Sequence, residues 1–188
     1  MPPDDASIAA SRELHQLFFA LWPDEGTRSR FAAAAEWLRA QGAQGRWIKP
    51  ERYHLTLHFL GRHAAAGEER LARACAAAGQ VSAGGFELGI DRAGSFALAR
   101  IPAWLGCSVP QVGLQALVAT LGEGLHAQGL RVEGEPFVPH VTVLRDAALP
   151  VRATLPKPVR WRVEEFVLVD SRIQPFAPYR IVGRWRLR

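Results

Sequence analysis

Cysteine and lysine are scarce in this chain of 188 residues, which has two of each, at Cys75, Cys107, Lys49 and Lys157. Two cysteines are too few for the disulfide framework of a small secreted domain, so we expect free thiols and a cytoplasmic protein. The first residues lack the basic-then-apolar order of a secretion signal. No apolar run approaches the ~20 residues that cross a bilayer, so no membrane association is expected.

The sequence also lacks the short motifs of several enzyme classes. It has no GxxxxGK[ST] loop to hold nucleotide phosphates and no GxSxG turn to present a serine nucleophile. The glycines at Gly122 and Gly124 lie within a helical pattern and are too sparse for a dinucleotide-binding loop. These absences argue against P-loop, α/β-hydrolase and dinucleotide-dependent chemistry.

The shortage of lysine leaves the formal net charge of +5 almost entirely to arginine. Guanidinium groups can hold phosphate oxygens in bidentate fashion, so this balance suits an anionic partner. A genome that favours arginine and alanine codons would produce the same composition. The charge therefore supports a phosphate-bearing ligand but does not establish one.

One short pattern occurs twice, at residues 54–57 (HLTL) and 140–143 (HVTV), close to half a chain apart. Each copy alternates polar and apolar side chains with the period of a strand, so histidine and threonine share one face. Two such pairs suggest a pseudo-symmetric site in which both imidazoles and both hydroxyls meet. One His-x-Thr strand alone would more often be structural, whereas two copies in matching context predict a common site.

Two imidazoles around one phosphate can supply both halves of a displacement reaction. A neutral imidazole takes a proton from water or a hydroxyl, and an imidazolium gives one to a leaving oxygen. Threonine hydroxyls donate to phosphate oxygens as negative charge develops. His58 is expected to share the face of His54 and Thr56. Four residues along a strand span ~13 Å, too far for two ligands of one metal ion, so no metal site is expected.

The hydrophobic pattern along the rest of the chain predicts a compact α+β fold with two sheets that face a shared cleft. Helices are expected at residues 23–42, 64–78 and 110–128, the last with Pro110 in its first turn. Strands are expected at residues 15–21, 46–49, 53–60, 86–90, 103–109, 137–144, 159–169 and 179–187. No low-complexity linker divides the halves, so residues 1–188 are expected to form a single domain.

The segments 54–61 (HLTLHFLG) and 139–145 (PHVTVLR) resemble the paired HxTx motifs of the 2H phosphoesterases. Within that superfamily the chain is most similar to the RNA 2′,3′-cyclic phosphodiesterases, also called 2′-5′ RNA ligases. The resemblance extends to residues 17–20, 104–106, 165–171 and Tyr179, and so spans nearly the whole sequence.

This resemblance implies a bilobal α+β fold with two pseudo-symmetric lobes, antiparallel sheets facing a central cleft and helices outside. It implies His54 as proton donor and His140 as proton acceptor, in a site without metal or organic cofactor. Thr56 and Thr142 match the phosphate-holding threonines, and Arg145 matches a family arginine after the second motif. Strict alternation would turn Arg145 away from the phosphate, so its participation requires a twist or bulge at the strand end.

The implied reaction is hydrolysis of a 2′,3′-cyclic phosphate at an RNA end to a 2′-phosphate, with reversible 2′-5′ ligation possible at the same site. Expected partners are RNA with such an end, or a nucleoside 2′,3′-cyclic phosphate, and the protein is expected to act as a monomer. Phe18, Phe59 and Phe137 are candidates to stack on a base, although each could be a core residue. Two alternatives remain open: a phosphodiesterase of small cyclic nucleotides, and a non-catalytic module that binds RNA ends.

Overall fold

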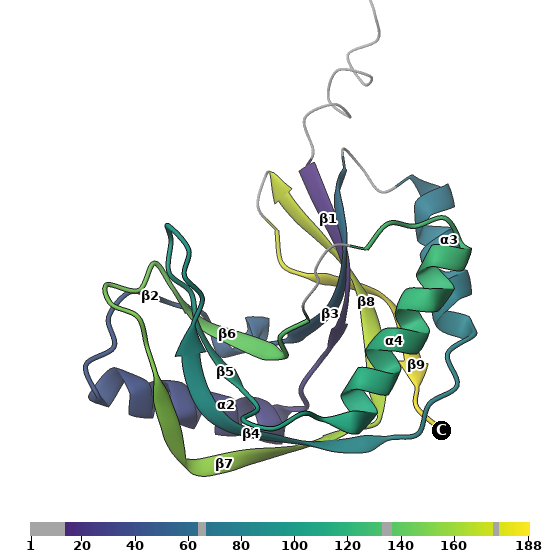
Figure 1. Ribbon diagram of the computed structural model, residues 1–188. Helices are drawn as coiled ribbons and strands as arrows, with labels where there is room; N and C mark the ends of the chain where they lie inside the picture. The colour runs from purple at the N-terminus through teal and green to yellow at the C-terminus, as the bar shows by residue number, and fades with distance from the viewer. Residues whose placement is uncertain (1–13, 64–66, 133–136, 175–176) are drawn as a thin grey trace, which may run out of the picture.

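The computed structural model describes residues 14–63, 67–132, 137–174 and 177–188. It has the expected α+β class, with antiparallel strands and helices packed outside them (Figure 1). The strands are β1 (Leu14–Leu21), β2 (Arg46–Trp47), β3 (Leu55–His63), β4 (Phe86–Ser95), β5 (Ala103–Gly106), β6 (His140–Arg145), β7 (Ala153–Val163), β8 (Glu165–Gln174) and β9 (Arg180–Arg186). The helices are α2 (Glu25–Ala40), α3 (Glu68–Gly79), α4 (Val112–Ala127) and the 3₁₀ turn η1 (Pro50–Arg52).

The strands form one continuous path in the order β7-β4-β5-β6-β3-β1-β8-β9, with β2 paired to β6. The sequence predicts two sheets. In the structure the two corresponding sets of strands form one sheet, because the motif strands β3 and β6 pair with each other. Within the described residues, the pairing of β3 with β6 consists of a single residue pair, Leu55 with Val141. We call β3, β1, β8 and β9 the first half-sheet, and β6, β5, β4 and β7 the second half-sheet.

The order of the strands along the chain does not follow the two half-sheets. Strand β4 follows β3 and α3 but pairs with β5 and β7 in the second half-sheet. Strand β8 follows β7 but returns to pair with β1 in the first half-sheet. Strand β4, from the first half of the chain, therefore lies in the second half-sheet, and β8, from the second half of the chain, lies in the first half-sheet.

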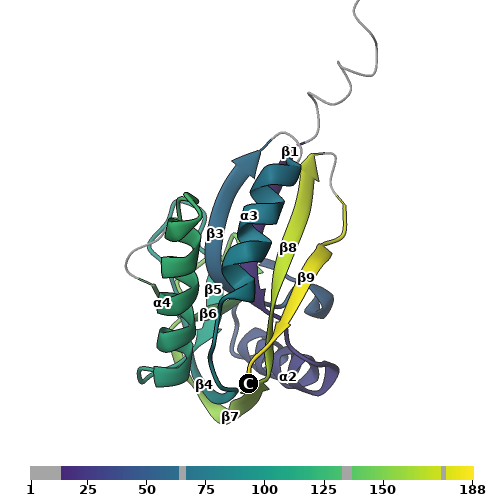
Figure 2. The same ribbon diagram turned by 90° about the vertical axis from the view of Figure 1, so that its right-hand side faces the viewer.

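The helices cover the outer faces of the half-sheets (Figures 1 and 2). Helix α2 lies against β7 of the second half-sheet, where Phe31 meets Trp161 edge to face with ring centroids 5.6 Å apart. Asp24 caps this helix by accepting a hydrogen bond from the Thr27 amide at 2.6 Å. Helices α3 and α4 pack on each other; α3 contacts β9 of the first half-sheet, and α4 contacts β3 of the first half-sheet and β4 of the second. The buried leucines and aromatics between these helices and the sheet make the main core.

Several expected boundaries are wrong: β4 extends to Ser95, β5 ends at Gly106 and β7 begins at Ala153. The single strand expected at residues 159–169 is two strands, because at Glu164 the chain leaves β7, which pairs with β4, and enters β8, which pairs with β1. Pro110 precedes the N-cap residue of α4, Gln111, and so lies outside the first turn. Both cysteines are free thiols, as expected, and in the described part of the chain no helix is long and apolar enough to cross a membrane.

Candidate active site

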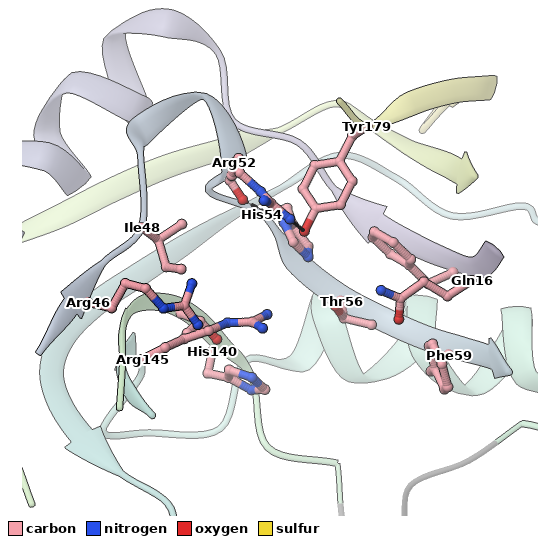
Figure 3. A pocket seen from close by; sticks show the side chains of 12 residues that line it. Gln16, Arg46, Ile48, Arg52, His54, Thr56, Phe59, His140, Arg145 and Tyr179 are labelled. Atoms are coloured by element: carbon pink, nitrogen blue, oxygen red, sulfur yellow. Dashed lines mark hydrogen bonds between the residues drawn. The ribbon is translucent and has the colours of Figure 1, made fainter. Parts of the chain in front are cut away.

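The two motif strands lie side by side at the centre of the sheet and open onto one pocket of about 250 Å³ (Figure 3). His54 precedes β3 directly and His140 is the first residue of β6. The pocket is lined by Gln16, Phe18, Arg46, Ile48, Arg52, His54, Thr56, Phe59, His140, Thr142, Arg145 and Tyr179. The structure therefore brings together both His-x-Thr pairs and Arg145.

The two imidazoles are oriented by the same local contact. His54 Nδ1 lies 2.8 Å from the carbonyl oxygen of Arg52, and His140 Nδ1 lies 2.7 Å from that of Val138. A carbonyl oxygen can only accept, so each Nδ1 carries the hydrogen. In both neutral rings Nε2 then carries the lone pair that a proton-transfer step requires.

Burial disfavours the charged form of both rings. Removal from water is the main reason that the pKa of His54 falls to about 4; the hydrogen bond to the Arg52 carbonyl opposes this shift, and the charges of His140, Arg52 and Arg145 add to it. Burial likewise lowers the pKa of His140. At neutral pH both imidazoles are therefore neutral in the free protein, and a bound phosphate anion would favour protonation of one of them.

A bulge turns Arg145 toward the pocket. The β6 residues Thr142 and Leu144 pair with successive residues of β5, so Val143 has no partner of its own on that strand. Because a bulge reverses the alternation, Val143 and Leu144 are both buried, and Arg145 emerges on the face of Thr142. This is the strand irregularity that the participation of Arg145 requires.

The first motif strand has the same irregularity at the equivalent position. Thr56 and His58 pair with successive residues of β1, which leaves Leu57 as the extra residue. His58 consequently turns away from the pocket, and its Nε2 lies 2.8 Å from the Val118 carbonyl in α4. The expectation that His58 shares the face of Thr56 is therefore wrong. Phe59 emerges into the pocket instead, at the position that corresponds to Arg145.

The aromatic surroundings of the two histidines differ. The ring of His54 is stacked on Trp22 at 5.6 Å with an interplanar angle of 10°. It also contacts Phe18 at 5.1 Å and the edge of Tyr179 at 5.3 Å. Aromatic faces attract a cation, so this enclosure can hold an imidazolium as well as orient it. Across the pocket, Phe96 meets the ring of His140 edge to face at 4.9 Å.

Three arginines make the pocket positive. Arg46 is held by the Asp146 carboxylate at 3.2 Å. Arg52 lies over the Tyr179 ring at 4.5 Å and donates to its hydroxyl at 2.9 Å. Arg145 forms no ion pair with any carboxylate in the described segments and is exposed, so its guanidinium is available to an anion.

The aromatic candidates have different positions. Phe59 is partly exposed in the pocket, whereas Phe18 lines it but is 4% exposed and packs against the aromatic enclosure of His54. Phe137 packs against the main core and is absent from the pocket lining.

Sequence reasoning missed several lining residues, namely Gln16, Arg46, Ile48, Arg52 and Tyr179. Of these, Tyr179 lies in the segment that resembles the family, while Arg52 could have been suspected only from its closeness to His54. Within the described ranges no group of three or more histidine, cysteine, aspartate or glutamate side chains is arranged to hold a metal ion.

Comparisons with known proteins agree with this arrangement. Residues 21–103 match the model of the LigT-like phosphoesterases. The RNA 2′,3′-cyclic phosphodiesterase of Escherichia coli K12 is 36% identical over 147 residues, which are 76% of this chain and 80% of that protein. The protein of the same name from Methanothermobacter thermautotrophicus is 33% identical over 132 residues, 68% of this chain and 69% of its own.

The crystal structure of Escherichia coli LigT in its apo form superposes with a TM-score of 0.75 and 31% identity, covering 93% of this chain and 98% of LigT. The likeness thus extends well beyond the two motifs, over nearly the whole fold. The chain belongs to the LigT-like phosphoesterase family of the 2H superfamily.

Proposed function

We propose that this protein hydrolyses RNA 2′,3′-cyclic phosphate ends to 2′-phosphates, as a single bilobal domain that acts as a monomer in the cytoplasm. The observation that carries the proposal is the shared orientation of His54 and His140, whose Nδ1 atoms are both held by backbone carbonyls beside one pocket. The names of the curated relatives support the same reaction. Because all the residues of the pocket come from one chain, the proposal requires no second copy.

His140 is the proton acceptor in this mechanism. Its Nε2 takes a proton from water as the water oxygen attacks phosphorus. The bond between phosphorus and O3′ breaks on the opposite side, and His54 gives its Nε2 proton to O3′. The product has a 2′-phosphate and a free 3′ hydroxyl. The stacked Trp22 beside His54 supports its assignment as the proton donor, since the donor is the ring that must carry a positive charge.

Thr56, Thr142 and Arg145 hold the phosphate in this proposal. The two threonines occupy equivalent positions on the motif strands and line the pocket. Their hydroxyls donate to the non-bridging oxygens, and the guanidinium of Arg145 offsets charge that builds up as water attacks. Phe59 is the best placed of the aromatic candidates to stack on the terminal base, because it is partly exposed beside the phosphate position.

A direct test incubates the purified protein with EDTA and nucleoside 2′,3′-cyclic phosphates, then with oligoribonucleotides that end in a 2′,3′-cyclic phosphate. We expect only 2′-phosphate products, and a larger kcat/KM for the oligonucleotides. A preference for the mononucleotides would favour the small cyclic nucleotide alternative. Binding without turnover would favour the RNA-end module, and activity that EDTA abolishes would contradict the mechanism.

A further inference from the structure

The second half-sheet continues the face of the active site beyond His140. Residues directly opposite each other on neighbouring strands share a face of a sheet. In one such row His140 on β6 lies opposite Gly106 on β5, which lies opposite Arg92 on β4. Two strand spacings separate the ends of the row, so the backbone of Arg92 is about 10 Å from that of His140.

An aromatic floor connects the two ends of this row. Thr142 lies opposite Trp104, and Trp104 lies opposite Gly94. A side chain at Gly94 would come within 2.5 Å of the Trp104 ring, so this glycine lets the ring lie flat on the sheet. Phe96 completes the floor, because its ring centroid is 5.4 Å from that of Trp104 and 4.9 Å from that of His140.

The far end of the floor is a groove of about 890 Å³ lined in part by Trp104, Arg92 and Arg152. The guanidinium of Arg92 lies over the Trp104 ring at 5.6 Å. Neither arginine forms an ion pair with a carboxylate of the described segments, and both are exposed. The carboxylate of Asp91, which also lines the groove, accepts hydrogen bonds from the Ser108 amide and hydroxyl. The groove therefore presents positive charge beside the aromatic floor, in which Phe96 is partly exposed and Trp104 is 8% exposed. Positive charge beside aromatic rings is the combination that binds single-stranded nucleic acid.

We propose that this surface, made of Phe96, Trp104, Arg92 and Arg152, is a second nucleotide subsite. It binds a ribonucleotide whose 5′ oxygen then lies beside His140. The inference rests on the proposed function, in which the attacking group enters on the side of His140. A 5′ hydroxyl at that place replaces water: O5′ bonds to phosphorus, the bond to O3′ breaks, His140 receives the O5′ proton and His54 protonates O3′. The product is a 2′-5′ phosphodiester, and the reverse reaction returns a cyclic phosphate and a 5′ hydroxyl.

Arg92 in this arrangement contacts the 3′-phosphate of the nucleotide in the subsite. A charge-assisted contact with phosphate contributes enough that its loss at an exposed site costs about tenfold in kcat/KM. The cost falls only on reactions that use the second nucleotide, because Arg92 does not line the pocket of His54 and His140.

The test compares two reactions of the same protein: hydrolysis of a nucleoside 2′,3′-cyclic phosphate by water, and cleavage of a 2′-5′-linked dinucleotide whose second nucleoside carries a 3′-phosphate. We expect the ratio of cleavage to hydrolysis to fall about tenfold in Arg92→Gln and further in Arg92→Glu, with partial recovery in Arg92→Lys. Arg73→Gln is the matched control, since Arg73 is an exposed arginine of α3, away from this surface, and should leave the ratio unchanged.

A second comparison uses the dinucleotide without the 3′-phosphate. The wild-type protein should prefer the phosphorylated form, and Arg92→Gln should lose that preference. Cleavage that is undetectable while hydrolysis proceeds, or a ratio that Arg92→Gln and Arg92→Glu leave unchanged, would overturn the second subsite. A wild-type protein that hydrolyses no cyclic phosphate would instead overturn the proposed function itself.

Discussion

The pH dependence of the reaction should report the burial of both imidazoles. In the proposed mechanism His54 must be protonated and His140 neutral, so activity depends on a pair that holds one proton. Burial lowers the pKa of both rings, that of His54 to about 4, from an unperturbed value of about 6.5. The optimum of kcat/KM, which reports the free enzyme, should therefore lie on the acid side of pH 6.5.

The size of the effect follows from the pKa of His54. With a value of about 4, roughly one molecule in a thousand carries the proton on His54 at pH 7. Each further pH unit lowers that fraction about tenfold, so kcat/KM should fall about tenfold per unit between pH 6.5 and 8. In the complex, the negative charge of the phosphate stabilises the imidazolium, so kcat should have its optimum at a higher pH than kcat/KM.

The assay measures kcat and kcat/KM with a nucleoside 2′,3′-cyclic phosphate between pH 4 and 8, in EDTA and at constant ionic strength. His54→Ala should lose the alkaline limb, since the remaining base, His140, works whenever it is neutral. His140→Ala should lose the acid limb for the converse reason. A wild-type kcat/KM that is flat or rising from pH 6.5 to 8, or an alkaline limb that persists in His54→Ala, would refute the reasoning.

The other predictions concern the roles of the motif residues and the cost of burying them. His54→Ala and His140→Ala should each lower kcat by about 10²–10⁴-fold. Thr56→Val and Thr142→Val should each lower kcat only about tenfold. Equal losses of kcat in the histidine and threonine variants, measured in steady-state assays, would contradict the assigned roles. A substrate with a better leaving group than a 3′ hydroxyl should partly rescue His54→Ala and not His140→Ala, and the opposite pattern would reverse donor and acceptor. The free energy of unfolding should fall as pH drops from about 6.5 to 4, because in this range the unfolded chain binds protons on histidines that stay neutral when they are buried in the folded protein. Urea titrations should show this fall, and His54→Gln should make the free energy of unfolding depend less steeply on pH.

The sequence was sufficient to predict the class of fold and the meeting of the two motifs, because hydrophobic alternation and a repeated pattern are local signals. The bulges at Leu57 and Val143 were harder to predict. A bulge depends on how a strand pairs with its neighbour, and regular alternation is the only expectation available before pairing is known. This is why regular alternation places His58 on the wrong face, and why the sequence can place the irregularity before Arg145 only at the end of the strand and not at Val143.

The enclosure of His54 illustrates a second limit. Trp22 follows β1, Tyr179 precedes β9, and Arg52 belongs to η1, so three distant segments meet at one ring. None of them has a spacing or a motif that connects it to the others. Their convergence is set by the order of strands in the sheet, in which β8 returns to β1 and β9 follows β8. The second subsite was missed for the same reason, since Arg92 and His140 become neighbours only across β5.

The exchange of strands between the two half-sheets has a consequence for how such a chain can be divided. If the chain were cut between β4 and β5, the first fragment would contain β4 without the strands that flank it in the sheet, and the second would contain β8 without β1. Helix α2 would likewise be separated from β7, the strand it covers. Neither fragment could close a half-sheet alone, so the two should recover activity only when mixed.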